Sequence, residues 1–439
     1  MAFCLTILYV SISLLSLQLL GPYLAQYHPE MWIGGSAVLA SLLSNLNLRL
    51  LTGPSSIFLL ILIFDVGASL IVNHWPGGAP GAVMAFAPAA MVFYLILLNA
   101  RSKRRLIILA VCLAGCALLL IAIGTKAYLA RDTMDPMILA QGPGVLRLRA
   151  FGILNDPNDL AQYVLITMPL LWVFWRKGSW FRNLFLVLVP TAISLCGLFL
   201  THSRGGLIAL LLMVFFTLQQ RLGKLKSTLA AVILLVGSSA LNFTGGRDVS
   251  MQSGSDRLEF WSHSLILFRS SPILGIGFGR VSDFPHTAHN SFVHCAAELG
   301  FVGYFFWMGM IVFAIADLRQ LERISVAHHE AATSAQTLLS SKGSDSGRAL
   351  SLCDFERRYA KLLKISFVAY LATSFFLSRP YAITLYLLLG MSAALTSIAK
   401  REGVIPANVP LWGRLRTTAL IALSSIIFIH MLVAVHWAL

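Results

Sequence analysis

Apolar runs long enough to cross a lipid bilayer recur along the whole sequence. A bilayer core about 30 Å thick is spanned by a helix of roughly 20 apolar residues. Hydrophobic residues make up 57% of the 439-residue chain and charged residues only 12%, whereas a soluble domain carries about 25% charged residues. This shortage of charge predicts that much of the surface faces lipid. We therefore expect an all-α, polytopic transmembrane bundle of twelve or thirteen spans.

Clusters of Lys and Arg indicate how the chain is oriented. The apolar runs lie near residues 4–20, 31–48, 55–72, 82–99, 105–123, 158–175, 182–200, 205–220, 227–243, 301–316, 362–377, 381–398 and 416–437. The basic clusters follow the even-numbered runs, for example at 101–105, 176–182 and 221–226. By the positive-inside rule these loops are cytoplasmic, which predicts a cytoplasmic N-terminus. The same placement accounts for the net charge of +15 without a nucleic-acid partner.

This orientation divides the chain into three parts. Residues 1–243 are expected to form the first nine spans, and residues 301–439 the last spans with a cytoplasmic loop at 317–361. Residues 244–300 form the only sizeable hydrophilic segment on the predicted periplasmic side. Chemistry outside the membrane is therefore expected in 244–300, and membrane lipids surround the rest.

The hydrophilic segment contains three short motifs. They are Asp256-Arg257-Leu258-Glu259-Phe260-Trp261, then Gly275-Ile276-Gly277-Phe278-Gly279, then His289-Asn290 followed after nine residues by Gly300, two residues and Gly303. The glycine-rich motif lacks the spacing and the βαβ context of a dinucleotide-binding loop. It predicts a turn in which two backbone segments approach closely.

A fourth motif, Ser203-Arg204-Gly205-Gly206, lies between two apolar runs on the same predicted side. An arginine at a membrane boundary is costly unless it serves an anion or a carboxylate. Guanidinium groups bind phosphates bidentately, so Arg204 and Arg257 could offset the charge on a departing diphosphate. A neutral His289 could accept the proton of an attacking hydroxyl. Such a set suits glycosyl transfer that needs no cofactor and no metal.

The pattern His-Asn, nine residues, Gly-x-x-Gly resembles the signature of the bacterial O-antigen ligase family and its polymerase relatives. The Ser-Arg-Gly-Gly motif, the Arg-x-x-x-Trp at Arg257–Trp261 and the stretch from Gly152 to Ala161 look similar to that superfamily as well. The resemblance implies a GT-C-like membrane glycosyltransferase of the bacterial inner membrane. Its donor would be a glycan on undecaprenyl diphosphate, and its acceptor would be lipid A–core or another glycan.

The resemblance also implies roles for individual residues. Arg204 and Arg257 would hold the donor diphosphate, and His289 would be the base. The further candidates are the substrate-binding residues Asn290, Trp261, Arg379 and Glu259 and the motif glycines Gly300 and Gly303.

Plainer interpretations stay open for several of these residues. His289 could cap a helix, Arg257 could pair with Asp256 or Glu259, and Arg204 could extend from the bilayer to water. A zinc site from His286, His289 and His294 matches no standard spacing. The run Asn155-Asp156-Pro157-Asn158-Asp159 could simply start a helix, with Asp156 as the capping residue.

Two alternative functions also stay open. An O-antigen or exopolysaccharide polymerase would share the donor chemistry. A secondary transporter or lipid-glycan flippase would place its polar groups on broken helices at mid-membrane.

Overall fold

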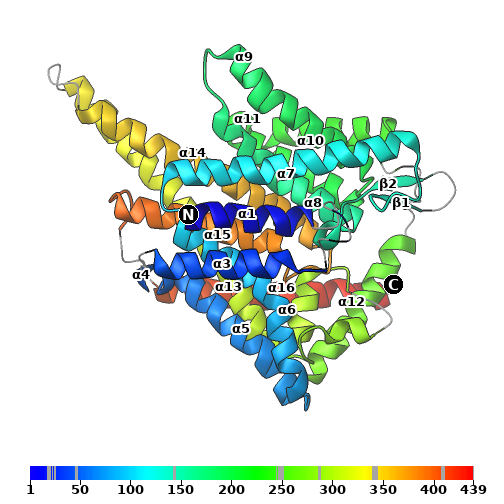
Figure 1. The fold of residues 1–439 in the computed structure, drawn as a ribbon. Coiled ribbons are helices and arrows are strands. Elements are labelled where there is room, and N and C mark those ends of the chain that lie inside the picture. The colour runs from blue at the N-terminus through cyan, green and yellow to red at the C-terminus, as the bar shows by residue number, and fades with distance from the viewer. Residues whose placement is uncertain are drawn as a thin grey trace.

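The computed structural model describes residues 1–16, 21, 23, 26–44, 48–141, 145–243, 245, 252–284, 288–338, 345–406 and 411–438. Nearly all of this chain is helical (Figure 1). The helices of the first half are α1 (Ala2–Leu15), α3 (Pro29–Leu43), α4 (Leu48–Leu51), α5 (Pro54–Val72), α6 (Ala79–Asn99), α7 (Lys103–Ala130), α8 (Pro157–Thr167), α9 (Trp180–Asn183) and α10 (Val189–Leu200). Those of the second half are α11 (Arg204–Ala240), α12 (Gln252–Ser270), α13 (Ser291–Leu338), α14 (Asp345–Ser374), α15 (Ile383–Arg401) and α16 (Leu411–Ala438).

The two strands of the described chain form an antiparallel hairpin, β1 (Ile138–Ala140) and β2 (Leu146–Leu148), with Leu139 opposite Arg147. The expected all-α transmembrane bundle is confirmed. Eight helices of the described residues are long and apolar enough to cross a membrane, and Ala2–Leu15 and Arg204–Gln219 are shorter apolar helices.

Three of the predicted runs form interrupted helices. The run near 158–175 becomes α8 followed by the 3₁₀ segment Met168–Phe174, which has a proline near its start. The runs near 205–220 and 227–243 form the two parts of α11, Arg204–Gln219 and Arg221–Ala240, which meet at a break at Gly223, where φ is 80°. The apolar pattern predicts which segments are buried or face lipid. It does not predict where the helical backbone is interrupted, and these interruptions affect the number of separate spans.

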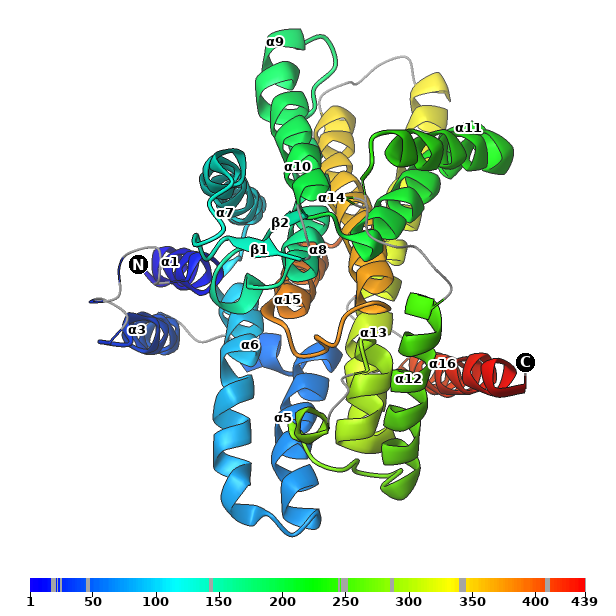
Figure 2. The ribbon, with the colours of Figure 1, turned by 90° about the vertical axis from the view of Figure 1, so that its right-hand side faces the viewer.

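Helix α13 lies at the centre of the bundle. It packs against α5, α14 and α16, while α6 packs against α5 and α15. The fully buried Trp307 of α13 donates its Nε1–H to the carbonyl of Pro380, 2.9 Å away. Figure 2 shows α8 in the interior with α10, α14 and α15 around it, and α12 and α16 on the side away from α1 and α3. Helix α8 therefore lies inside the bundle, with nearly all of its residues buried.

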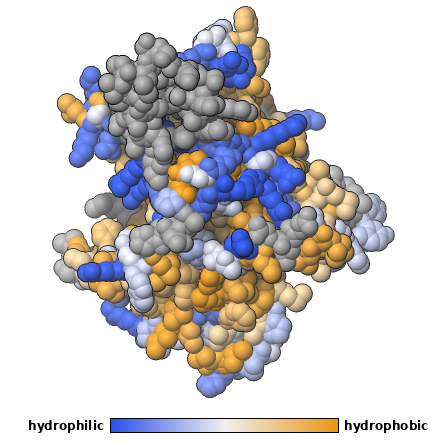
Figure 3. All heavy atoms as spheres, turned by 90° about the vertical axis from the view of Figure 1, so that its left-hand side faces the viewer, coloured by the Kyte–Doolittle hydropathy of each residue, from blue (hydrophilic) through white to orange (hydrophobic). Residues whose placement is uncertain are grey.

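The basic clusters predicted to be cytoplasmic gather at one end of the molecule. There Lys103, at the start of α7, pairs with Glu356 of α14 and lies 2.9 Å from Glu402, just after α15. Hydrophilic residues spread across the middle of this end, with hydrophobic residues beside them (Figure 3). The hairpin and α12 lie at the opposite end (Figure 1).

The segment expected to be a periplasmic loop is largely folded. Helix α12 occupies its first part, and a turn with positive φ at Gly275, Gly277 and Gly279 follows. This turn lies against a kink of α13 at Gly300, where a Cβ atom would come within 2.3 Å of the Ile273 backbone. The expected close approach of two backbone segments is confirmed. It fixes α12 relative to the start of α13.

Candidate functional site

The start of α11 forms the floor of a pocket. Ser203 caps this helix, because its Oγ accepts a hydrogen bond from the Gly206 N–H at 3.1 Å. The same hydroxyl donates to Asn158 Oδ1 at 2.7 Å, which joins α11 to α8. A Cβ atom on Gly205 would lie 3.1 Å from Phe376, and one on Gly206 would lie 3.1 Å from the Ala161 side chain. The two glycines therefore let neighbouring elements close around Arg204.

Four parts of the chain that are distant in sequence line this pocket. Its lining residues are Asn158, Ser203, Arg204, Gly205, Gly206, Arg257, Thr373, Phe376 and Leu377. The Arg257 guanidinium lies over the Phe376 ring, 5.4 Å from its centroid. Its Nη1 is buried and makes no hydrogen bond within the described chain. A cation held by an aromatic ring with an unused donor is arranged to receive an acceptor group from outside the protein.

The two predicted arginines influence each other electrostatically. Burial, and then the nearby positive charge of Arg204, lower the pKa of Arg257. Two guanidinium groups that repel each other in one pocket would both gain from an anion placed between them. The arrangement therefore favours binding of a multiply charged anion such as a diphosphate.

His289 faces the same charges from the start of α13. Its backbone has φ 44°, and its ring lies 5.9 Å from that of Phe260. Burial and then the charge of Arg257 lower its pKa, while the carboxylate of Asp156 opposes the shift. A lowered pKa keeps the imidazole neutral near pH 7, which a proton acceptor requires.

Asn290 fixes the backbone next to His289. Its Oδ1 accepts hydrogen bonds from the N–H groups of Phe292 at 2.9 Å and Val293 at 3.3 Å, so Asn290 caps α13. Helix capping was expected of His289, but the capping residue is Asn290. His289 directly precedes this cap.

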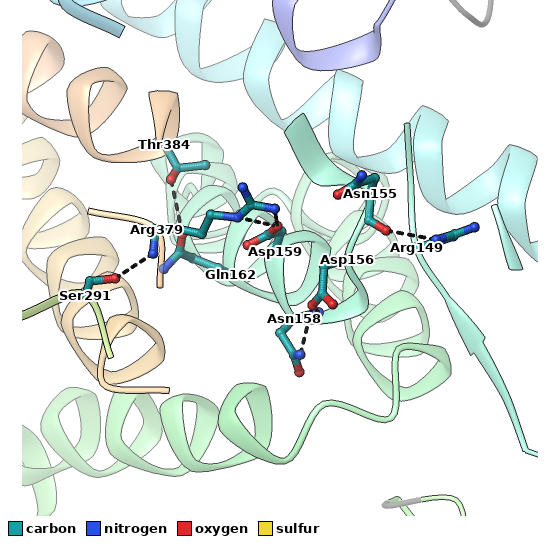
Figure 4. A network of polar contacts seen from close by, with 9 residues as sticks. All are labelled: Arg149, Asn155, Asp156, Asn158, Asp159, Gln162, Ser291, Arg379 and Thr384. Atoms are coloured by element: carbon teal, nitrogen blue, oxygen red, sulfur yellow. Dashed lines mark hydrogen bonds and ion pairs between the residues drawn. The ribbon is translucent and has the colours of Figure 1, made fainter. Parts of the chain in front are cut away.

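Arg379 forms an ion pair with Asp159 of α8, at 3.0 Å from both Nε and Nη2 to Oδ2 (Figure 4). The Arg379 N–H donates to Ser291 Oγ at 3.0 Å, and this hydroxyl donates to the Leu377 carbonyl at 2.5 Å. These bonds join the α14–α15 connection to the first residues of both α8 and α13.

We refer to residues 375–380 as the strap. Phe375 packs edge-to-face on Trp261 with ring centroids 5.1 Å apart. Phe376 lies under Arg257, and Pro380 accepts the indole hydrogen bond of Trp307. The strap therefore touches α12 and α13 and, through Arg379, α8.

The other predicted residues lie around the pocket and do not line it. Trp261 is buried in a small apolar cluster with Leu265 and Val293, and Glu259 is exposed. Gly300 lies at the kink of α13, and a Cβ atom on Gly303 would be 2.2 Å from Asp65 Oδ2. The structure thus brings Arg204, Arg257 and His289 together and gives the motif glycines a packing role.

The side-chain hydrogen bonds of Asn158 were not predicted from the sequence. Asp156 does cap α8, as expected, and accepts from the Asn158 N–H at 2.7 Å. The Asn158 side chain also donates to Asp156, and its Oδ1 accepts from Ser203 and from the buried Arg147 at 3.2 Å. The Asp-Pro-Asn-Asp pattern could have indicated this role. It was interpreted only as the start of a helix, because the cap at Asp156 already explained it.

Within the described ranges, no three His, Cys, Asp or Glu side chains come together as a metal site. His286, one of the three histidines in the zinc alternative, lies outside these ranges. His294 places its Nε2 3.1 Å from Glu298 Oε1, one helical turn along α13.

The family model described as O-antigen ligase matches residues 189–308. This stretch runs from α10 into α13 and contains both pocket arginines, His289, Asn290 and the two motif glycines. No curated protein matches the chain.

Proposed function

Since residues 189–308 match the O-antigen ligase family model, we propose that the chain belongs to this family and transfers a glycan from undecaprenyl diphosphate to an acceptor hydroxyl. The reaction takes place at the periplasmic face of the inner membrane, and lipid A–core is the acceptor. One observation carries the proposal, namely the pocket that Arg204 and Arg257 share beside His289. No soluble sugar nucleotide is needed, because the donor already carries its leaving group.

The donor diphosphate binds between the two guanidinium groups. As the bond between the anomeric carbon and the diphosphate oxygen breaks, its electron pair passes to that oxygen, and negative charge grows there. Arg204 and Arg257 stabilise this charge, and because both side chains are partly buried the interaction is stronger than in bulk water. The undecaprenyl diphosphate then leaves as an anion and does not need a proton.

His289 serves the acceptor. The attacking hydroxyl oxygen forms the new bond to the anomeric carbon and transfers its proton to the imidazole. The lowered pKa of His289 provides the neutral form, and the imidazolium produced then releases the proton to solvent. His289 and the arginines therefore act on opposite sides of the anomeric carbon.

A product assay tests this proposal. The purified protein in lipid nanodiscs receives labelled undecaprenyl-diphosphate glycan, with and without lipid A–core. A product that requires lipid A–core supports the ligase. A ladder of longer glycans from donor alone would identify a polymerase with the same donor chemistry. Absence of product together with movement of labelled donor across the bilayer would replace the proposal with a flippase.

A further inference from the structure

Three buried polar groups lie along one face of α12. Arg257, Trp261 and Ser264 are spaced i, i+4 and i+7, which places them on the same side of a helix. Each has a buried atom without a hydrogen-bond partner in the described chain: Nη1, Nε1 and Oγ respectively. Trp261 is 5% exposed and Ser264 is 0% exposed. The row starts at Arg257, which lines the pocket.

Asn290 adds a fourth group from α13. Its side chain is 0% exposed, and its Oδ1 is used in capping. Its Nδ2 has no partner in the described chain. Val293, which donates its N–H to Asn290, packs in the same cluster as Trp261. The Asn290 amide therefore lies close to the face of α12 that carries the row.

Buried donors without partners are rare in folded proteins, because each has lost its hydrogen bonds to water. Four of them in one place indicate a ligand rich in hydrogen-bond acceptors. Only Arg257 is charged, so the rest of the row suits neutral oxygens such as sugar hydroxyl, ring or acetamido groups more than a second phosphate.

We propose that Arg257, Trp261, Ser264 and Asn290, here called the donor row, bind the first sugar of the lipid-linked glycan. The inference rests on the proposed function, because the sugar attached to the diphosphate is the group that continues from Arg257 along α12. Phe375 of the strap and Phe292 border this region, and Phe375 packs on Trp261. The sugar enters by displacing Phe375, and it then gives each donor an oxygen partner.

Binding of two probes tests this inference. The first is undecaprenyl diphosphate alone, and the second is undecaprenyl diphosphate carrying a single N-acetylglucosamine. Their Kd values are measured in nanodiscs by calorimetry. Wild-type protein should bind the glycosylated probe more tightly. Trp261→Phe and Ser264→Ala should each weaken that probe about 5- to 10-fold, as expected for one lost hydrogen bond, and leave the bare lipid unchanged.

The thermal midpoint separates binding from folding. Ser264→Ala removes a buried hydroxyl that has no partner, so the unliganded Tm should stay the same or rise. Trp261→Phe also leaves a small cavity in an apolar cluster and should lower the Tm slightly. Ser270→Ala is the matched control on the same helix, because Ser270 Oγ already donates to the Leu267 carbonyl at 2.7 Å. It should alter neither Kd. Arg257→Ala should weaken both probes.

Each of the other possible results contradicts either this inference or the proposed function. Equal weakening of both probes by Trp261→Phe and Ser264→Ala would show that these residues only shape the pocket, which overturns the inference. Unchanged affinity for both probes would overturn it too. Wild-type protein that binds the bare lipid and gains nothing from the sugar would remove the sugar site and leave the proposed function intact. Failure of wild-type protein to bind the bare lipid would count against the proposed function itself.

Discussion

The guanidinium of Arg379 places both Nε and Nη2 3.0 Å from the same carboxylate oxygen of Asp159. Asp159 is almost wholly buried at the start of α8, and Arg379 belongs to the strap. The pair connects parts of the chain that are 220 residues apart in sequence. The contacts of Arg379 indicate that it holds the strap, including Phe376 under Arg257, and its expected role in binding substrate stays a prediction.

Breaking this pair should reduce both stability and transfer. Arg379→Ala leaves the buried Asp159 carboxylate without its partner. Because the Arg379 side chain is 46% exposed, the cost should be smaller than the about 3–5 kcal/mol of a fully buried pair. We expect a lower Tm and a lower kcat. Adding Asp159→Asn to the Arg379→Ala variant removes the unpaired negative charge and should recover most of the lost stability. A thermal-unfolding double-mutant cycle measures the coupling; additive effects of the two substitutions would show that the pair does not fasten the strap.

The charges around His289 predict opposite shifts of the pH–rate profile. His289 acts as a base only when neutral, so kcat/KM should rise as pH increases through its pKa. Arg257 lowers that pKa and Asp156 raises it. Neutralising Asp156 as Asn should move the acid limb to lower pH, and the substitution keeps a good helix cap. Neutralising Arg257 as Met should move the limb to higher pH, in addition to weakening donor binding.

His289→Ala serves as the reference for this experiment. It should leave donor binding and folding near normal and abolish transfer together with the acid limb. A variant that retained wild-type turnover would show that another group accepts the proton.

The sequence identified the residues that meet at the pocket better than it predicted what holds them there. Arg204, Arg257 and His289 could be found because each belongs to a short motif whose chemistry is unusual at a membrane boundary. The strap could not be predicted, although Arg379 itself was a candidate, because Phe376 and Arg379 act through contacts with residues more than 100 positions away. Asn158 was missed for a different reason: Asp156 and Pro157 already explain its motif as a helix start, and that local role conceals the bonds to Ser203 and Arg147.

Transfer should not depend on a divalent metal. The proposed chemistry uses two guanidinium groups to neutralise the diphosphate and an imidazole to accept a proton, and none of these steps needs a Lewis acid. Turnover should therefore persist after exhaustive treatment with EDTA and dialysis. The matched control is the same preparation with zinc or magnesium restored. Lost activity that either ion recovers would require a metal in the mechanism and would revive the zinc alternative.

Gly300 should be intolerant of any side chain. Its φ of 62° is strained for other residues, and a Cβ atom would lie 2.3 Å from the Ile273 carbonyl, a backbone contact that cannot rotate away. Gly300→Ala should therefore separate the glycine-rich turn from α13. That turn fixes the end of α12, so Arg257 should lose its position over Phe376, and both Tm and donor affinity should fall.

Gly237→Ala is the matched control, because Gly237 lies within α11 and nothing comes within 4 Å of an added Cβ atom. It should keep full donor affinity and gain slightly in stability, since alanine favours a helix by about 1 kcal/mol over glycine. The two variants are compared by thermal unfolding and by the Kd for undecaprenyl diphosphate. Equal behaviour of both would show that the contact at the kink does not position the arginine pocket.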